Sequence, residues 1–399
     1  MCSKAIELKN VVIICASGDI AETIELYNLI NSSISDEPLG LTDSEKSTDS
    51  TSESSDSDSD NSQERRSTSN CSSSSLSSAS DDSDSTIYPD NEYSNRAQNF
   101  YFGDRKMEET VDAMPEREFR ELFRMTRRVF ELLLFRLEDH IPLGLSSNGK
   151  SISPRLQLMI FLYYVTGDIP ARHLAVAAGV KKSKCRRICI QMVEIIIESG
   201  FLDEYFQLPT EEQGRYEAKL LTQRSGMPEI FTGAADGTQI DVWVKRRQQK
   251  LFFNRYKRKA INCMAYGGIT GLFYALEASA SGSRHDNAVF QGSKLYEQLK
   301  NGNLPFEGAK IVGDAAYTSD LPFMVIPFPD HEVKHNPSKE KYKKKFRRVC
   351  VPIKNNFGMW KMMFPVLQNG VKCKSVKKAG RLIMALGAIN NFIVLHTTE

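Results

Sequence analysis

The spacing of hydrophobic residues divides this chain into a part with a helical period and a later part with strand-like runs. Between residues 116 and 222, apolar residues recur at steps of three and four, the period of amphipathic helices that pack on a core. One helix is predicted from the series Phe119, Leu122, Phe123, Val129, Phe130, Leu133, Leu134 and Leu137. A second is predicted to begin at Ser153-Pro154, because proline fits the first position of a helix.

A helix-turn-helix pattern lies inside this helical part, over residues 171–195. The first segment ends in Gly179, a tight turn follows, and a basic helix is predicted to begin near Ser183. In a helix-turn-helix the second helix enters the major groove of DNA. Its candidate DNA-binding residues are Lys182, Lys184, Arg186 and Arg187. A plain helical hairpin with solvated charges has the same pattern, so both interpretations stay open.

From residue 228 the pattern changes to short apolar runs separated by polar turns. Strands are predicted at 230–235, 240–244, 260–266, 272–280 and 310–313, and helices near 286–300, 355–363 and 375–395. Strands and helices mixed in this way indicate an α/β layer fold with a mixed sheet. The predicted fold class is therefore mixed α/β, in which a helical subdomain with a helix-turn-helix-type unit precedes a mixed sheet flanked by helices.

Composition separates an acidic segment from a basic remainder. Residues 36–92 contain 15 acidic and 3 basic residues, a net charge of −12, so the rest of a chain of formal charge +2 carries +14. Such Ser/Asp-rich sequence cannot bury enough apolar surface to offset chain entropy. We predict a disordered acidic linker at 41–95, either phosphorylated or merely solubilising. The other predicted parts are an unassigned segment 1–40, the helical subdomain 116–222 and a domain at 228–396.

A basic folded part beside an acidic flexible part is typical of nucleic-acid proteins. Residues 245–259 contain eight basic residues with aromatic residues among them. The cations could neutralise phosphates and the aromatic rings could stack on bases, although a solvated hairpin is the alternative. The candidate DNA-binding residues here are Lys245, Arg246, Arg247, Arg255, Lys257 and Arg258.

The cysteines and the apolar runs indicate the compartment. The eight cysteines include no CxxC pair, which predicts reduced thiols in a cytosolic or nuclear protein. The apolar run near the start, residues 11–16, is too short to span a bilayer. We therefore expect a soluble chain with no membrane partner and no evident small-molecule substrate.

Two motifs each put one aspartate at or just after the end of a predicted strand. They are residues 234–238, with Asp236, and residues 310–317, with Asp314. Two carboxylates from separate strands of one sheet are what a metal-dependent phosphodiester site needs, because Mg²⁺ takes a few hard oxygen ligands. Asp286, after His285, either adds to such a site or caps the following helix.

Eight motifs in order, from about Phe119 to Asn391, resemble the PIF/Harbinger transposase-derived nucleases of the DDE superfamily. The motifs are Phe123–Thr126, Ser153-Pro154 with Phe161–Tyr164, the helix-turn-helix, Leu208–Thr210, Ala235–Thr238, Gly282–Asp286, Gly313–Tyr317 and Phe357–Lys361. The resemblance implies an RNase-H-like core, DNA as the substrate, and Mg²⁺ or Mn²⁺ as the cofactor. It also implies that Asp236 and Asp314 are catalytic acids and metal ligands, with Asp286 as a further candidate ligand.

The third acid of that family is a Glu three residues before the Phe-Gly pair, and here the position holds Lys354. An ammonium there repels a divalent cation and adds no oxygen ligand, so the inherited hydrolysis is expected to be weakened or lost. Candidate replacement acids are Asp330, Glu332 and Glu340. Relatives also often carry an Asp where this chain has Gly267-Gly268.

Three classes of function stay open for such a chain. The first is an active metal-dependent DNA endonuclease in which another acid completes the site. The second is a catalytically silent DNA-binding protein of nuclease-like fold. The third is an interaction scaffold in a chromatin complex, with a separate DNA-binding or chromatin protein as partner. We expect the nucleus as the compartment, with the cytoplasm as the alternative.

Overall fold

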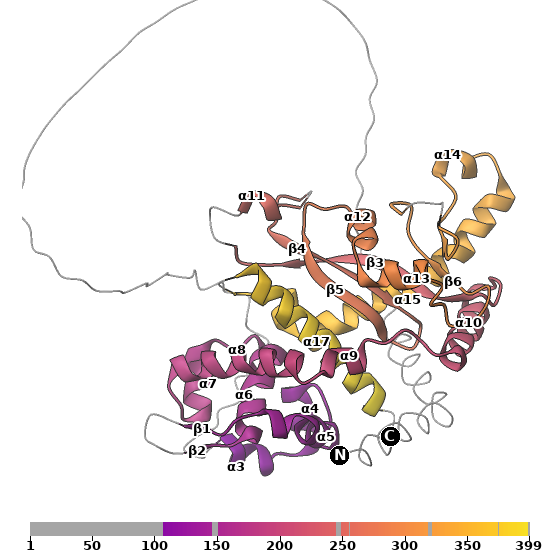
Figure 1. The fold of residues 1–399 in the computed structure, drawn as a ribbon. Coiled ribbons are helices and arrows are strands. Elements are labelled where there is room, and N and C mark those ends of the chain that lie inside the picture. Colours follow the sequence, from indigo (N-terminus) through magenta and orange to yellow (C-terminus); the bar gives the residue numbers. More distant parts are fainter. Residues whose placement is uncertain are drawn as a thin grey trace, which may run out of the picture. The chain divides into compact units, whose positions relative to one another are not determined.

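The fold is described by a computed structural model for residues 107–145, 151–244, 249–254, 256–317, 321–373 and 375–397 (Figure 1). These residues all belong to one compact unit. The predicted segments 1–40 and 41–95 lie outside the described residues.

The first part of the described chain is helical, as the apolar spacing predicted. Its helices are α3 (Met107–Asp112), α4 (Glu116–Phe123), α5 (Arg127–Leu137), α6 (Pro154–Gly167), α7 (Ala171–Ala178), α8 (Lys182–Glu198), α9 (Phe201–Tyr205) and α10 (Glu211–Ser225). A 3₁₀ turn (Glu138–His140) and a two-stranded ribbon, β1 (Gly144–Leu145) with β2 (Ser151–Ile152), lie between α5 and α6.

The series from Phe119 to Leu137 forms two helices, so the prediction of one was wrong. Arg124 adopts a left-handed conformation with φ of 59°, which ends α4. Thr126 then starts α5, because its side chain accepts a hydrogen bond from the backbone N–H of Val129. The apolar spacing continues across this break because both helices bury their apolar residues in the same hydrophobic core.

The other local signals in this part act as predicted. The Ser153 hydroxyl accepts a hydrogen bond from the Leu156 N–H, with Pro154 in the first turn of α6. Gly179 ends α7 with φ of 63°, a backbone conformation that glycine adopts without steric cost. Thr210 and Gln213, for which no cap was predicted, form a reciprocal capping box at the start of α10.

The second part contains a five-stranded mixed sheet in the order β5-β4-β3-β6-β7. The strands are β3 (Phe231–Asp241), β4 (Ala260–Gly267), β5 (Phe273–Ser281), β6 (Lys310–Val312) and β7 (Met324–Val325). β3, β4 and β5 are antiparallel, whereas β6 and β7 run parallel to their neighbours. This is the mixed sheet that the sequence predicted.

β3 is one continuous strand where two had been predicted, and Asp236 lies in its middle. β4 pairs with β3 without interruption from Ala234 to Asp241, which carries the strand through Gly237 and Thr238. On the other side, the register to β6 ends at Ala234 opposite Val312. Asp236 is therefore not at a strand end, but it lies just beyond the end of its parallel neighbour.

Helices cover both faces of the sheet, and the side chains of β3 alternate between them. Ala234 and Ile240 share a core with α15 (Pro337–Met363) and α17 (Val376–Thr397). Ala235 belongs to a second core with Phe290 and Leu295 of α12 (Asp286–Gln291) and α13 (Lys294–Lys300). Asp236 has the parity of Ala234, so its side chain lies on the face covered by α15.

α15 is far longer than the predicted helix near 355–363. It continues through Pro352 because Phe346, Val349 and Ile353 are buried on one face, and this packing outweighs the lost backbone hydrogen bond. The remaining helices are α11 (Gln249–Phe252), α14 (Asp330–Val333) and α16 (Pro365–Gln368). The single predicted helix 286–300 is divided into α12 and α13, where the Ser293 hydroxyl caps α13.

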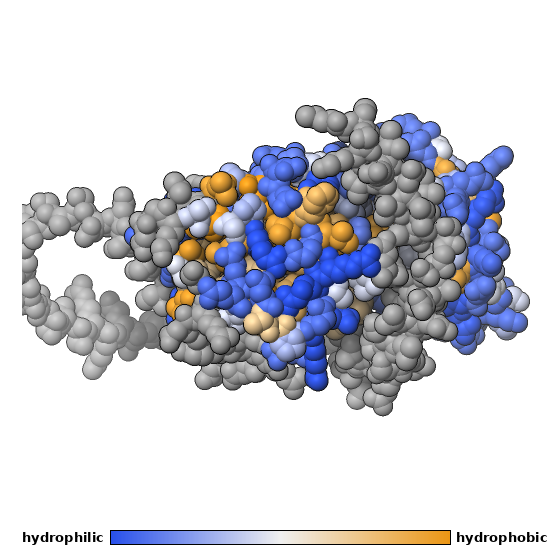
Figure 2. All heavy atoms as spheres, turned by 90° about the horizontal axis from the view of Figure 1, so that it is seen from below, coloured by the Kyte–Doolittle hydropathy of each residue, from blue (hydrophilic) through white to orange (hydrophobic). Residues whose placement is uncertain are grey.

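α17 is the one described helix that is long and apolar enough to cross a membrane, but 72% of its most apolar window is buried inside the protein. That burial is what a core helix of a folded domain requires. On the face drawn in Figure 2, the hydrophobic areas of the coloured residues are small and separated by hydrophilic side chains.

Candidate functional site

Asp236 lies in β3, and Asp314 lies two residues beyond the end of its parallel neighbour β6. Ala234 of β3 lies opposite Val312 of β6, and each aspartate follows its partner residue by two positions. The two carboxylates are near enough for the charge of Asp314 to raise the pKa of Asp236. One oxygen of each carboxylate is held by backbone: Asp236 Oδ1 accepts from the Gly237 N–H and Asp314 Oδ1 from the Ala316 N–H, both at 2.9 Å.

Lys354 reaches this pair from α15. Its Nζ lies 4.0 Å from Asp236 Oδ2, the oxygen that the Gly237 N–H does not occupy. The Lys354 side chain is 65% exposed and the Asp236 side chain only 13%. The ammonium thus lies on the solvent side of a buried carboxylate, at the position where the resemblance predicted a third acid.

The environment of Asp236 disfavours its charge. The pKa of Asp236 is raised to about 6, mainly by burial and to a smaller extent by the nearby charges of Asp314 and Asp286. The Lys354 ammonium and the Gly237 N–H act in the opposite direction but do not cancel the effect of burial. Asp236 therefore titrates close to neutral pH instead of near pH 4.

Asp286 does not cap α12, so the capping interpretation of this residue was wrong. The N-cap is His285, whose side chain makes no capping hydrogen bond, and Asp286 is the first helical residue. Its Oδ1 accepts a hydrogen bond of 2.6 Å from the buried Asn262 amide. A Cβ on Gly237 would lie 2.4 Å from that same oxygen, so only glycine leaves room for Asp286 there.

Asp286 approaches β3 from the face opposite to Asp236. Gly237, against which it packs, has the parity of Ala235, whose core is formed with α12 and α13. The three carboxylates are near enough for their charges to affect the pKa of Asp236, yet they lie on both sides of one strand.

Sequence reasoning missed Cys350 and did not assign a role to Tyr317. Cys350 lies one helical turn before Lys354 on α15, and burial raises its pKa to about 12, with Asp236 as a further cause. Burial also raises the pKa of Tyr317, and all three aspartates add to this. The four-residue spacing from Cys350 to Lys354 was the one signal in the sequence that could have brought Cys350 into the site.

The acids suggested as replacements for the third carboxylate are engaged elsewhere. Asp330 pairs with Lys343, Glu332 with Lys339 and Glu340 with Lys344. These hydrogen-bonded lysines lower the pKa of each of the three carboxyl groups. Glu340 is also about 21 Å from Lys354 along α15, at 1.5 Å per residue.

At Gly267-Gly268, the second departure expected from the resemblance, the nearby carboxylate is that of Glu217 in α10. A Cβ on Gly268 would lie 2.1 Å from Glu217 Oε1. Glu217 of α10 is buried and accepts hydrogen bonds from the Ile269 N–H, the Thr270 N–H and hydroxyl, and the Tyr274 hydroxyl. This carboxylate fixes the turn between β4 and β5 and lies apart from the aspartates.

The donor set around Asp236 does not fit a divalent metal centre. Across the described residues, no three His, Cys, Asp or Glu side chains come close enough to hold one ion. Asp236 and Asp314 offer oxygen ligands, but Lys354 adds a positive charge beside Asp236 and no lone pair. Mg²⁺ is usually bound through one or two carboxylates and several waters, so two carboxylates would suffice in number, and it is the Lys354 charge that makes this set unsuitable.

The predicted basic surfaces are only partly described. α7 and α8 are two helices joined at Gly179, with Cys185, Ile188 and Met192 buried, an arrangement that a helix-turn-helix and a plain helical hairpin share. On the solvent side of α8, Lys182, Arg186 and Arg187 are exposed and Lys184 is half-buried. In the hairpin, Lys257 and Arg258 are exposed, and Arg258 pairs with Asp241. Lys245, Arg246, Arg247 and Arg255 lie outside the described residues.

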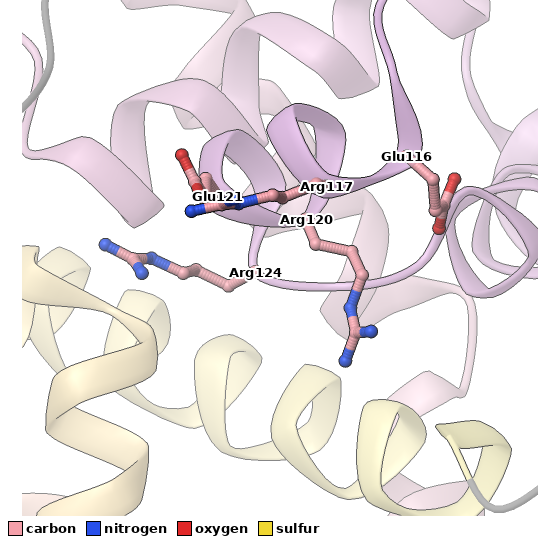
Figure 3. A pocket seen from close by; sticks show the side chains of 5 residues that line it. All are labelled: Glu116, Arg117, Arg120, Glu121 and Arg124. Carbon is pink, nitrogen blue, oxygen red and sulfur yellow. Dashed lines mark hydrogen bonds and ion pairs between the residues drawn. The ribbon is translucent and has the colours of Figure 1, made fainter.

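A shallow cavity of about 360 Å³ lies on α4, away from the predicted site residues (Figure 3). It is lined by Glu116, Arg117, Arg120, Glu121 and Arg124. Arg117 pairs with Glu121 at 3.2 Å, and Arg120 points away from that pair. The mixed charge of this lining gives it no clear ligand.

Residues 235–391 match the family of DDE superfamily endonucleases. The chain is also 23% identical over 260 residues to a rat (Rattus norvegicus) protein named "Putative nuclease HARBI1", covering 63% of this chain and 70% of that protein. The resemblance to the Harbinger transposase-derived nucleases is confirmed. A mouse (Mus musculus) protein of the same name is 25% identical over 174 residues, covering 43% of this chain and 48% of its own length. No solved structure matches the chain.

The matched range begins within β3 and ends within α17, so it contains most of β3, the other four strands of the sheet, and the helices from α11 to α16. The mixed α/β architecture agrees with the RNase-H-like core predicted for this family. DDE superfamily endonucleases generally use divalent metals, and a nuclease family implies a nucleic acid as substrate. Asp236, Asp286, Asp314 and Lys354 all lie within the matched residues.

Proposed function

We propose that this protein is a Harbinger transposase-derived, nuclease-like protein that binds DNA and whose metal-dependent phosphodiester hydrolysis is impaired. The observation that supports the proposal is the Lys354 ammonium, 4.0 Å from the oxygen of Asp236 that is not held by backbone. The inherited cofactor would be Mg²⁺ or Mn²⁺, with Asp236 and Asp314 as ligands and Asp286 as a further candidate.

The charge of Lys354 opposes such an ion. Two unit charges 4 Å apart interact by ~1 kcal/mol in water and ~4 kcal/mol at an effective dielectric of ~20, and a divalent ion doubles this. Burial raises the pKa of Asp236 to about 6, so this carboxyl group is ionised at pH 7 and becomes a poorer metal ligand only as the pH falls below about 6. At neutral pH the Lys354 charge is therefore the effect that opposes a cation here.

DNA binding is proposed to rest on two basic surfaces. On α8 the cations are Lys182, Lys184, Arg186 and Arg187, and on the β3–β4 hairpin the described cations include Lys257 and Arg258. Lysine and arginine side chains attract phosphates whatever the sequence of the DNA. We propose the nucleus as the compartment and a separate DNA-binding or chromatin protein as partner. The five described cysteines, all free thiols, support a reducing compartment.

The decisive experiment is a nicking assay on supercoiled plasmid with Mg²⁺ or Mn²⁺. The unmodified protein is expected to cleave little or not at all, and Lys354→Glu is the variant in which cleavage can return. Asp236→Ala added to Lys354→Glu should abolish any cleavage that appears. Robust cleavage by the unmodified protein that is lost in Asp236→Ala would refute impairment.

A second candidate function is an active DNA endonuclease in which Asp286 completes the site. It is favoured by one observation, that the charge of Asp286 raises the pKa of Asp236 and is therefore close to it. The location of Asp286 against Gly237, on the other face of β3, speaks against it. In that case Asp286→Asn should abolish cleavage by the otherwise unmodified protein.

A further inference from the structure

α15 is strongly basic, and the acid site uses only one of its cations. Its 27 residues include nine lysines and arginines but a single acid, Glu340. The nine cations are Lys339, Lys341, Lys343, Lys344, Lys345, Arg347, Arg348, Lys354 and Lys361. Which of these side chains contact the protein, and which face solvent, decides what they can bind.

Four of these cations bind other elements of the protein. Lys339 and Lys343 pair with carboxylates of α14. Lys345 donates to the backbone carbonyl just after α10 at 2.8 Å, and Lys361 donates to the Thr238 hydroxyl of β3 at 2.7 Å. These contacts fix how α15 is turned about its own axis, so the remaining cations point in a defined direction.

The other five cations lie together on the solvent side of α15. They are Lys341, Lys344, Arg347, Arg348 and Lys354, and all are exposed. Because each residue of a helix turns by ~100°, these five lie within an arc of ~140°. That arc is opposite to the buried Phe346, Val349 and Ile353. We call the five residues the cationic stripe of α15.

The charge of the stripe is largely uncompensated. Within the part of the chain that the structure describes, Lys341, Arg347 and Arg348 form no ion pair. Lys344 pairs with Glu340 at 2.8 Å, but these side chains are 69% and 55% exposed, and a solvated pair of this kind is weak. The stripe therefore attracts anions from solution.

The stripe ends at the acid site. α15 begins beside α14 and then packs on β3 (Figure 1). Lys341 and Lys354 are about 20 Å apart along the helix, at 1.5 Å per residue, and Lys354 Nζ lies 4.0 Å from Asp236 Oδ2. Each strand of duplex DNA has one phosphate per ~3.4 Å of its axis, so a stripe of this length can face about six phosphates.

Gly358 leaves open space one helical turn beyond Lys354, on the same face of α15. Glycine within a helix costs about 1 kcal/mol relative to alanine. No atom of the described residues lies within 4 Å of the place where a Cβ on Gly358 would be. Packing inside the protein therefore gives no reason for glycine here, whereas close approach of a ligand to the helix backbone does.

We infer that the cationic stripe of α15 binds the phosphate backbone of DNA and leads one strand to the acid site, where Lys354 contacts a phosphate. The inference rests on the proposed DNA binding and adds to it a third surface and a path for the strand. It also gives Lys354 a role of its own, because an ammonium that repels a metal ion attracts a phosphate.

The first test removes charge from the stripe and follows the salt dependence of binding. A fluorescein-labelled 20-base-pair duplex is titrated with the full chain in EDTA, and its anisotropy is read at several salt concentrations. Arg347→Gln combined with Arg348→Gln should lower the slope of the logarithm of the association constant against the logarithm of the salt concentration by about 1.8, since each phosphate contact contributes ~0.9. The matched control, Lys294→Gln with Lys300→Gln, removes two exposed cations from α13 on the other face of the sheet and should leave the slope unchanged.

Two further variants test the end of the path. Lys354→Gln should lower the slope by about 0.9 in EDTA. A lysine that only repelled a metal would leave DNA binding unchanged there, because no metal is present. Gly358→Leu changes no charge and should weaken duplex binding roughly fivefold or more by filling the open space. Its thermal unfolding should occur at an equal or higher temperature, because leucine favours a helix more than glycine does.

The outcomes separate this inference from the proposed function. If the duplex binds and the α15 double variant behaves like the α13 control, the stripe is overturned and DNA binding through the other basic surfaces stands. An unchanged slope in Lys354→Gln, or unchanged affinity in Gly358→Leu, overturns the path to the acid site. Failure of the unmodified protein to bind the duplex overturns the DNA-binding proposal together with the stripe. Thermal unfolding of each glutamine variant at the temperature of the unmodified protein confirms that it is folded.

Discussion

The charge of residue 354 controls how well the acid site can take up a divalent cation. Lys354→Glu removes an ammonium 4.0 Å from Asp236 Oδ2 and adds a carboxylate, a change of two charges. We expect Mn²⁺ and Mg²⁺ to bind this variant more tightly than the unmodified protein. The same change should raise the pKa of Asp236 in the absence of metal, because Lys354 now lowers it.

The size of the effect follows from Coulomb's law. A unit pair at 4 Å is worth ~1 kcal/mol in water, so two charges acting on a divalent ion amount to ~4 kcal/mol. We use the aqueous figure because the Lys354 side chain is 65% exposed and solvent screens it. Even a third of this, ~1.4 kcal/mol, is a tenfold change in Kd. The prediction is therefore at least tenfold tighter binding.

Isothermal titration with MnCl₂ measures the affinity directly, and thermal unfolding in 10 mM MgCl₂ measures it through linkage. The matched control is Lys341→Glu, which makes the same charge change on the same helix about 20 Å away, at 1.5 Å per residue. If Lys354→Glu binds Mn²⁺ no more tightly than this control, then Lys354 is not what weakens the site, and our reasoning about it is wrong.

Three further predictions concern the acid site, the basic surfaces and the buried Glu217. Asp236→Asn should stabilise the protein by ~3 kcal/mol at pH 7 and by almost nothing at pH 4. The pKa of Asp236 is about 6 in the folded protein against an ordinary 3.8, so ionisation of this group costs the native state stability as the pH rises from about 4 to above 6. Equal thermal shifts at both pH values would contradict this. DNA affinity should fall steeply as the salt concentration rises. Alanine at the six hairpin cations from Lys245 to Arg258 named above, or at Lys182, Arg186 and Arg187, should flatten the slope of the logarithm of the association constant against the logarithm of the salt concentration. A slope that is unchanged in both sets of variants excludes both basic surfaces as DNA contacts. Glu217→Ala should lower the free energy of unfolding in urea by more than ~2 kcal/mol, because it leaves buried N–H and hydroxyl donors of the β4–β5 turn unpaired. Glu217→Gln should lower it less. Equal losses in the two variants would mean that packing and not hydrogen bonding matters at this position.

Features that depend on a few neighbouring residues were predictable from the sequence. Ser153-Pro154 starts α6, Gly179 ends α7 and Thr210 starts α10, since each uses hydrogen bonds or backbone angles within one turn of helix. The apolar period located the helical part for the same reason. The order of eight motifs identified the family, and the placement of Asp236 and Asp314 on separate predicted strands indicated that the two acids would lie together.

What the sequence alone could not decide depends on contacts between segments far apart in the chain. β3 continues through Asp236 because β4 pairs with it, and α15 continues through Pro352 because its apolar face packs on the sheet. The Asp286 carboxylate does not cap a helix, because it accepts a hydrogen bond from Asn262 of β4 and packs against Gly237 of β3, which has no side chain to exclude it. Residue order along the chain fixes which groups are available, whereas strand register and helix packing fix which of them meet. Lys354 and Asp236 are 118 positions apart in sequence. Only the packing of α15 on β3 brings Lys354 Nζ to 4.0 Å from Asp236 Oδ2.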